Sequence, residues 1–297
     1  MSRQGSTSSS RAGWALLGVS AAFVAAAAFL VRGAPTAITG LEVATAEDVA
    51  DAVLHLAYGL VGALILMRQP RSLFGWAFCL IALCFEANLF AGAYSAYGTF
   101  THPGSLPAPQ LLSVVSDMLL VPCFVLVLTF VPLLFPTGRP PTRRWWIVGV
   151  AAAVTIVLAT TSMAIRPGPV DEDVPSAGAN PLGIAGADAV ADALEFAALV
   201  VFLLAAVGSL ASAAVRIRRS HGEERRQLKI FLVGVAVVFA VFFVPDEPLG
   251  LGGEVGQIAL AVVGILALPI AVAIALLRPG RDPGPPTPLE AHELALR

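Results

Sequence analysis

Long apolar stretches alternate with short polar ones along the chain. A bilayer core about 30 Å thick is crossed by roughly 20 apolar residues in a helix. Eight segments meet this length or nearly so, each bounded by polar, glycine or proline clusters: Trp14–Val31, Asp51–Met67, Phe74–Tyr97, Leu111–Phe135, Trp145–Ile165, Val190–Val215, Ile230–Val244 and Val255–Leu277. The seventh is the shortest and is expected to extend back through Gln227–Lys229. We therefore predict an all-α integral membrane protein, a bundle of about eight transmembrane helices.

The first segment has two interpretations. Arg3 and Arg11 precede an alanine-rich apolar run, as in a signal peptide, but the run exceeds the usual 7–15 residues of a signal core. We expect an uncleaved helix at the start of a transmembrane domain over residues 13–278. The flanking stretches 1–12 and 279–297 are polar or proline-rich and are expected to be disordered cytoplasmic ends.

The basic residues set the orientation of this bundle. With the N-terminus inside, all but two of the 18 Lys and Arg fall in inner pieces, and only Arg32 and Arg166 lie outside. The outer pieces are acidic instead: Glu42, Glu47, Asp48, Asp171, Glu172, Asp173, Asp188, Asp246, Glu247 and Glu254. Positive residues resist translocation, so this asymmetry predicts that both termini are cytoplasmic and that the protein is a multi-pass protein of the cell membrane.

Ionisable residues inside the predicted helices are the candidate site. Charged groups within hydrocarbon are costly, so each prompts a functional hypothesis. His55, Glu86, Asp117 and Glu195 all fall between the outer surface and roughly the midplane. They either form one polar cluster that binds a cation or responds to pH, or are satisfied one by one near the interface.

Two inner loops carry dense positive charge in the stretches FPTGRPPTRRWW and RIRRSHGEERRQLK. Such clusters bind anionic lipid head groups or a cytoplasmic partner; they also serve simply as topology signals, with tryptophans as interfacial anchors. Nucleic-acid binding is not expected, because the loops are short and pressed against the membrane. The candidate lipid or partner surface consists of Arg139, Arg143, Arg144, Arg216, Arg218, Arg219, Arg225, Arg226 and Lys229.

Composition and motifs argue against a soluble enzyme. Hydrophobic residues make up 57% of the chain and charged residues 13%, against roughly 25% charged in soluble domains, and the mean hydropathy is +0.83. The three cysteines, Cys79, Cys84 and Cys123, lie in apolar runs without metal-ligand spacing and read as small buried hydrophobes. No phosphate loop, nucleophile elbow or zinc-protease helix is present. We therefore expect no catalytic residues, no metal and no cofactor.

Five phrases in order, covering roughly residues 50–278, resemble the N-terminal multi-pass membrane region of actinobacterial sensor histidine kinases: VGALILMRQPRSLFGWAF, LLFPTGRPPTRRW, ANPLGI, RRSHGEERRQLK and LPIAVAIALLR. The departures are informative. Ser72, Leu73 and Phe74 precede Gly75, where those kinases usually carry an Asn-Pro pair. After the last helix the kinases continue into a phosphoacceptor helix and an ATP-binding domain, whereas residues 279–297 here are too few to bury a core.

His221 lies where the resemblance implies a connector, so kinase activity does not carry over. The resemblance implies a non-catalytic sensory or regulatory module that signals through a separate kinase or regulator. A small-molecule or lipid transporter, which would use the outer-half carboxylates, and a scaffold subunit of a membrane complex are the alternatives. The ligand and the oligomeric state are not predicted.

Overall fold

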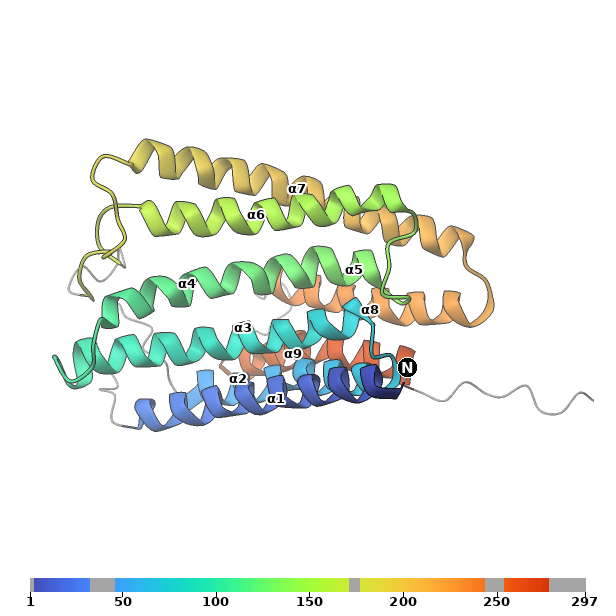
Figure 1. Ribbon diagram of the computed structural model, residues 1–297, viewed down its shortest axis with the longest axis horizontal. Helices are drawn as coiled ribbons and strands as arrows, with labels where there is room; N and C mark the ends of the chain where they lie inside the picture. Colours follow the sequence, from blue (N-terminus) through green and yellow to red (C-terminus); the bar gives the residue numbers. More distant parts are fainter. Residues whose placement is uncertain (1–2, 33–45, 171–176, 244–253, 278–297) are drawn as a thin grey trace, which may run out of the picture.

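Long helices running back and forth along one axis make up the computed structural model, which describes residues 3–32, 46–170, 177–243 and 254–277 (Figure 1). In chain order the elements are α1 (Arg3–Val31), α2 (Ala46–Arg68), α3 (Leu73–Ala96), the π-helical η1 (Tyr97–Thr101), α4 (Pro109–Val125), the π-helical η2 (Leu126–Phe130), α5 (Val131–Leu134), the 3-10 helix η3 (Arg143–Trp145), α6 (Trp146–Ile165), α7 (Asp188–Arg219), α8 (Gly222–Phe243) and α9 (Glu254–Leu277). No strand occurs among these described residues, which confirms the all-α prediction.

Each predicted apolar segment corresponds to one of these helices when α4, η2 and α5 are taken as one continuous stretch, but α1 begins at Arg3, so the expectation of disorder over residues 1–12 is wrong for residues 3–12. Within the described ranges, five helical stretches are long and apolar enough to cross a membrane: Ser8–Val31, Leu73–Thr101, Pro109–Leu134, Arg143–Ile165 and Asp188–Arg219. Their outward faces are apolar as well, with Phe29, Ile147 and Leu204 each more than two-thirds exposed. Exposing such an apolar surface to water is unfavourable in free energy, whereas contact with lipid is not. The fold is therefore that of a multi-pass membrane protein.

Local sequence explains where several helices begin and end. The Ser72 side chain accepts a hydrogen bond from the Gly75 amide at 3.4 Å and caps the start of α3. The α7–α8 turn has Gly222 at φ 55°, a left-handed conformation that favours glycine. After α6, the Asn180 side-chain amide donates to the carbonyls of Met163, Ala164 and Arg166 and so closes that helix end.

Small residues let the helices of the core approach closely. A Cβ at Gly62 of α2 would lie only 2.8 Å from the Cys79 amide nitrogen and from the Gly75 carbonyl oxygen of α3. Likewise, a Cβ at Gly234 of α8 would lie 2.7 Å from the Cβ of Ala271 in α9. Glycine at such crossings is typical of helix packing in membranes. The aromatic core between these pairs is built from Tyr58, Phe74, Phe78, Phe135 and Phe231.

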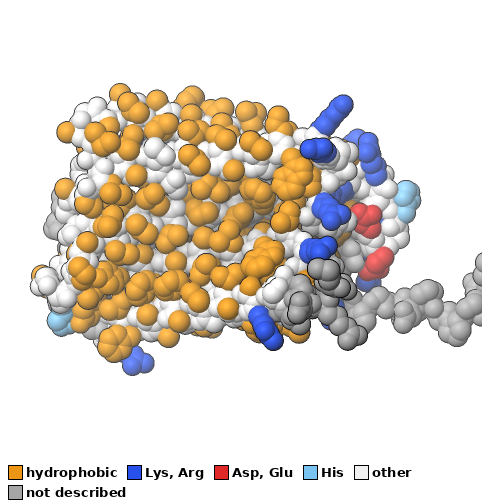
Figure 2. Space-filling model, in the orientation of Figure 1, with side chains coloured by type: hydrophobic (Ala, Val, Ile, Leu, Met, Phe, Trp, Pro, Cys, Tyr) orange, Lys and Arg blue, Asp and Glu red, His pale blue; other side chains and the backbone are white. Residues whose placement is uncertain are grey.

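The two ends of the bundle differ in charge. One end, which we call the basic end, is formed by residues 68–73, 134–146 and 216–229; the opposite end is formed by residues 97–109, 165–170 and 177–188. Figure 2 shows apolar side chains covering most of the length of the visible face, with Lys and Arg side chains concentrated beyond them at the basic end. The sequence pattern therefore becomes a spatial separation of charge in the folded chain.

Candidate functional site

The structure places the predicted outer-half polar residues in different surroundings. Glu86 in α3 is fully buried, whereas the side chain of Glu195 in α7 is 68% exposed. Asp117 lies on an exposed position of α4. The ring of His55 in α2 stacks on Phe85, with ring centroids 4.2 Å apart. The buried and the exposed carboxylates are thus separate features, each with its own surroundings.

Glu86 lies in the part of the bundle where α1, α2 and α3 pack together. Leu17 of α1 and Ala82 of α3 both pack against Gly59 of α2. A Cβ at Gly59 would lie 3.0 Å from Cδ1 of Leu17 and 3.2 Å from Cβ of Ala82. Since α1 and α3 run in the same direction, Ser20 and Glu86 lie one turn further along at a similar level. Both side chains are fully buried, and neither has a hydrogen-bond partner within the described part of the chain.

Glu195 belongs instead to an ion-pair cluster at the opposite end. Arg166, just after α6, donates through Nη1 to Oδ1 of Asp192 at 2.9 Å and through Nη2 to Oε2 of Glu195 at 2.5 Å. The two acids are three residues apart on α7 and therefore face the same way. One oxygen of each carboxylate takes part in these bonds, and about two-thirds of each acidic side chain is exposed. The cluster ties α7 to the end of α6 and carries one net negative charge.

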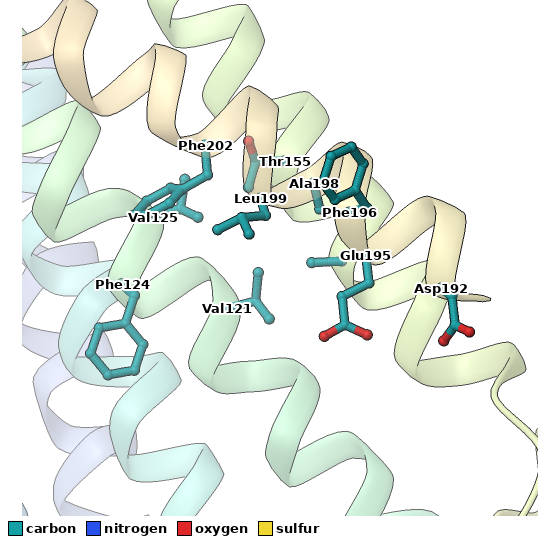
Figure 3. Close-up of a pocket in the computed structure, with 11 residues that line it drawn as sticks. Val121, Phe124, Val125, Thr155, Asp192, Glu195, Phe196, Ala198, Leu199 and Phe202 are labelled. Atoms are coloured by element: carbon teal, nitrogen blue, oxygen red, sulfur yellow. The ribbon is translucent and has the colours of Figure 1, made fainter. Parts of the chain in front are cut away.

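A groove runs from this cluster along the membrane-facing side of the bundle (Figure 3). Its volume is about 520 Å³, within the range of small-molecule sites. One wall is α4, the other is α7, and Thr155 and Ala159 of α6 lie between them. Apart from the acids at one end and Thr155, whose hydroxyl donates to the Ala151 carbonyl at 3.1 Å, the lining is apolar.

The groove exists because α4 and α7 diverge. They are joined toward the basic end, where the Ser209 hydroxyl of α7 donates to the Thr129 carbonyl of η2 at 2.5 Å. From that point toward the opposite end the two helices separate (Figure 1). Toward the basic end the groove meets the core, where Val125 is 3% exposed and Phe202 packs against the same cluster, whereas Asp192 at the other end has a side chain 67% exposed.

The structure places eight of the nine predicted basic surface residues on the outside of the basic end: Arg139, Arg143, Arg144, Arg218, Arg219, Arg225, Arg226 and Lys229. They come from the segment between α5 and α6, from the end of α7 and from the first turns of α8. Among these eight, only Arg226 forms a side-chain ion pair that the structure resolves, with Glu223 at 2.8 Å. The described basic end therefore presents a surface of strongly positive charge.

Arg216 does not belong to this surface. It is 7% exposed, because its guanidinium points inward and donates to carbonyl oxygens at the end of α5. The carbonyl acceptors are those of Phe135 at 2.6 Å, Leu133 at 3.2 Å and Arg139. The Thr137 hydroxyl also accepts a hydrogen bond from Arg216, at 3.1 Å. Arg216 fixes α7 to the α5 end and the loop that follows.

Two features at the end opposite to the basic end, the pairing of Arg166 and the groove, are not part of the sequence-based prediction. Arg166 appears in the sequence only as one of two outer basic residues, and its pairing with Asp192 and Glu195 depends on the irregular loop between α6 and α7. The spacing of the two acids on one helical face is the signal that a search for a local cation partner would use. The groove depends on the angle between α4 and α7, for which the sequence offers no comparable signal.

Comparisons with known proteins give no independent guide to this site. The chain matches no protein-family model, and no curated protein or solved structure is significantly similar to it.

Proposed function

We propose that the protein is a non-catalytic sensory or regulatory module of the cell membrane. In this proposal the eight helical stretches all span the bilayer, both termini lie in the cytoplasm, and the module acts through a separate protein bound at the basic end. Residues 13–278 form the membrane domain. The proposal concerns a binding and signalling role, with no substrate converted by this chain.

The observation that carries the proposal is the exposed positive surface of the basic end. Eight basic side chains project there from two neighbouring segments, and the acids of the same end are far fewer (Figure 2). Positive residues are retained on the cytoplasmic side of a membrane, which supports the proposed orientation. A surface of this kind attracts acidic protein segments and anionic lipid head groups alike.

The resemblance to histidine-kinase input regions supports a protein partner over lipid alone. Three of the five resembling phrases include turns of the basic end: RQPRS between α2 and α3, FPTGR after α5, and RRSHGEERR between α7 and α8. In the kinases that the chain resembles, the signal leaves the membrane region on the cytoplasmic side. The proposed partner is therefore a cytoplasmic or membrane-bound kinase or regulator.

Orientation is tested first, with single introduced cysteines. The three native cysteines are buried, so they can remain in place. A membrane-impermeant thiol reagent added to intact cells is expected to label a cysteine at Leu182 and to leave one at Arg143 unlabelled until the membrane is opened. The reverse labelling would overturn the proposed topology.

Partner binding is tested by photo-crosslinking in native membranes. A photoreactive residue at Arg225 is expected to capture a kinase or regulator, identified by mass spectrometry, and the same residue at Leu182 is the control at the opposite end. Replacing Arg218, Arg219 and Arg225 by glutamine is expected to reduce crosslinking from a probe at Arg143. Movement of a solute across liposome membranes by the purified protein would instead support the transporter alternative. Capture of a structural subunit that disappears when this chain is deleted would support the scaffold alternative.

A further inference from the structure

We propose that the groove between α4 and α7 binds one acyl chain of a membrane phospholipid whose head group carries an ammonium, with that ammonium held at Asp192 and Glu195. This inference goes beyond the proposed function and holds in either membrane orientation. It rests on the shape of the groove, its depth in the membrane and the charge at its mouth.

The groove has the dimensions of one leaflet. From Asp192 to Phe202 along α7 is 10 residues, about 15 Å at 1.5 Å per residue. A hydrocarbon core about 30 Å thick leaves about 15 Å for each leaflet. With the charged mouth at the level of the head groups, the apolar part of the groove would span the acyl chains of one leaflet.

The walls of the groove suit an acyl chain. Leu199 and Phe196 on α7 are 53% and 69% exposed, and Phe124 on α4 is 46% exposed. Figure 3 shows Val121 and Phe124 on one side and the α7 residues on the other, and the polar side chain near Phe202 is Thr155, whose hydroxyl is already bonded to the Ala151 carbonyl. A saturated chain in this space would contact carbon on both walls, so the groove offers dispersion contacts along its length.

The charge at the mouth selects the head group. Two carboxylates and one guanidinium leave a net negative charge, and both terminal nitrogens of Arg166 are already bonded to the acids. Figure 3 shows the Glu195 carboxylate directed across the groove toward Val121. A head-group ammonium placed there would gain an ion pair with the second oxygen of either acid. A head group with only negative charge would meet repulsion instead.

The test is lipid titration of the full-length detergent-solubilised protein, followed by native mass spectrometry. Phosphatidylethanolamine and phosphatidylglycerol with identical acyl chains are compared, so that only the head group differs. Two partly exposed carboxylates contribute modestly, and we expect the first phosphatidylethanolamine to bind about fivefold tighter than the first phosphatidylglycerol. Equal binding of the two lipids would overturn the head-group assignment.

Variants locate the binding. D192N/E195Q is expected to abolish the preference, whereas D188N, which removes an exposed acid of α7 outside the groove lining, is expected to keep it. E195Q alone, which leaves one ion pair of Arg166 in place, is the milder second variant and is expected to reduce the preference. If D188N and D192N/E195Q behave alike, the ammonium does not bind at this mouth.

A second pair of variants tests the acyl-chain groove. A159F places a ring in the groove and is expected to weaken the first binding of both lipids, whereas A153F adds the same ring on an exposed position of α6 outside the groove lining. L199W, at an exposed position of α7, also fills the groove. It replaces A159F in the test if A159F does not elute as a single folded species in size-exclusion chromatography. Unchanged affinity for both lipids in a folded groove-filling variant would overturn the proposal.

Discussion

Replacing Arg216 tests whether a single buried guanidinium holds α7 to the rest of the bundle. In Arg216→Met the apolar stem is retained while all donors are lost. The carbonyls of Leu133 and Phe135, both on fully buried residues, would then lose their bonds to Arg216 without access to water. Hydrogen bonds to charged groups are worth about 1.5–3 kcal/mol each. Taking the lower value for these two acceptors, we expect a loss of about 3 kcal/mol.

The other two acceptors of Arg216, at Thr137 and Arg139, belong to exposed residues and can bond to water, so they add little. Thermal unfolding of the purified protein, followed by tryptophan fluorescence, measures the effect. The matched control is Arg218→Met, which removes the same charge from an exposed position two residues away and is expected to change stability by less than about 0.5 kcal/mol. Arg216→Lys keeps the charge but lacks the planar fork, so its unfolding temperature is expected to fall between the two. Equal unfolding temperatures for Arg216→Met and Arg218→Met would refute the reasoning.

Three further pairs of substitutions test the packing. Gly62→Ala places a Cβ 2.8 Å from α3 backbone atoms and is expected to cost about 1–3 kcal/mol, whereas Gly18→Ala, with no heavy atom within 4 Å, is expected to be neutral or stabilising in the same unfolding assay. Ser209→Ala removes the bond to Thr129 and is expected to cost about 1 kcal/mol; Ser212→Ala, whose buried hydroxyl has no partner among the described residues, should cost less. Glu86→Gln keeps the buried shape without a carboxylate and is expected to unfold within about 0.5 kcal/mol of the native protein, whereas Glu86→Lys should cost about 3 kcal/mol or more. A large loss in Glu86→Gln would show that the carboxyl has a specific partner.

The sequence predicts the helices well because their signal is local. A run of apolar residues bounded by turn residues is sufficient to locate a helix in a membrane, and the seventh predicted segment, expected to extend back through Gln227–Lys229, does so in α8. The turn at Gly222 likewise follows from glycine next to acids that suit a helix start. These features need no knowledge of which helix packs against which.

The site could be predicted only in part, because it depends on packing between distant segments. Arg216 and Arg218 look equivalent in the sequence, yet one is buried and the other exposed, since only Arg216 faces the end of α5. In the sequence, Glu86 and Glu195 are both acids in the outer half of a predicted helix. In the structure, Glu86 is buried between helices, whereas Glu195 is exposed. The π-helical turn η2, where α7 joins the α4–α5 stretch, has no local signature beyond nearby prolines.

The length of α7 has a mechanical consequence. Its 32 residues span about 48 Å, against a hydrocarbon core of about 30 Å. The helix must therefore lean in the bilayer or extend beyond it, and its bond to η2 at Ser209 sets the point about which it would lean. In a thicker membrane the same helix would stand more upright. Bilayer thickness would then alter the angle between α7 and α4, and with it the width of the groove between them.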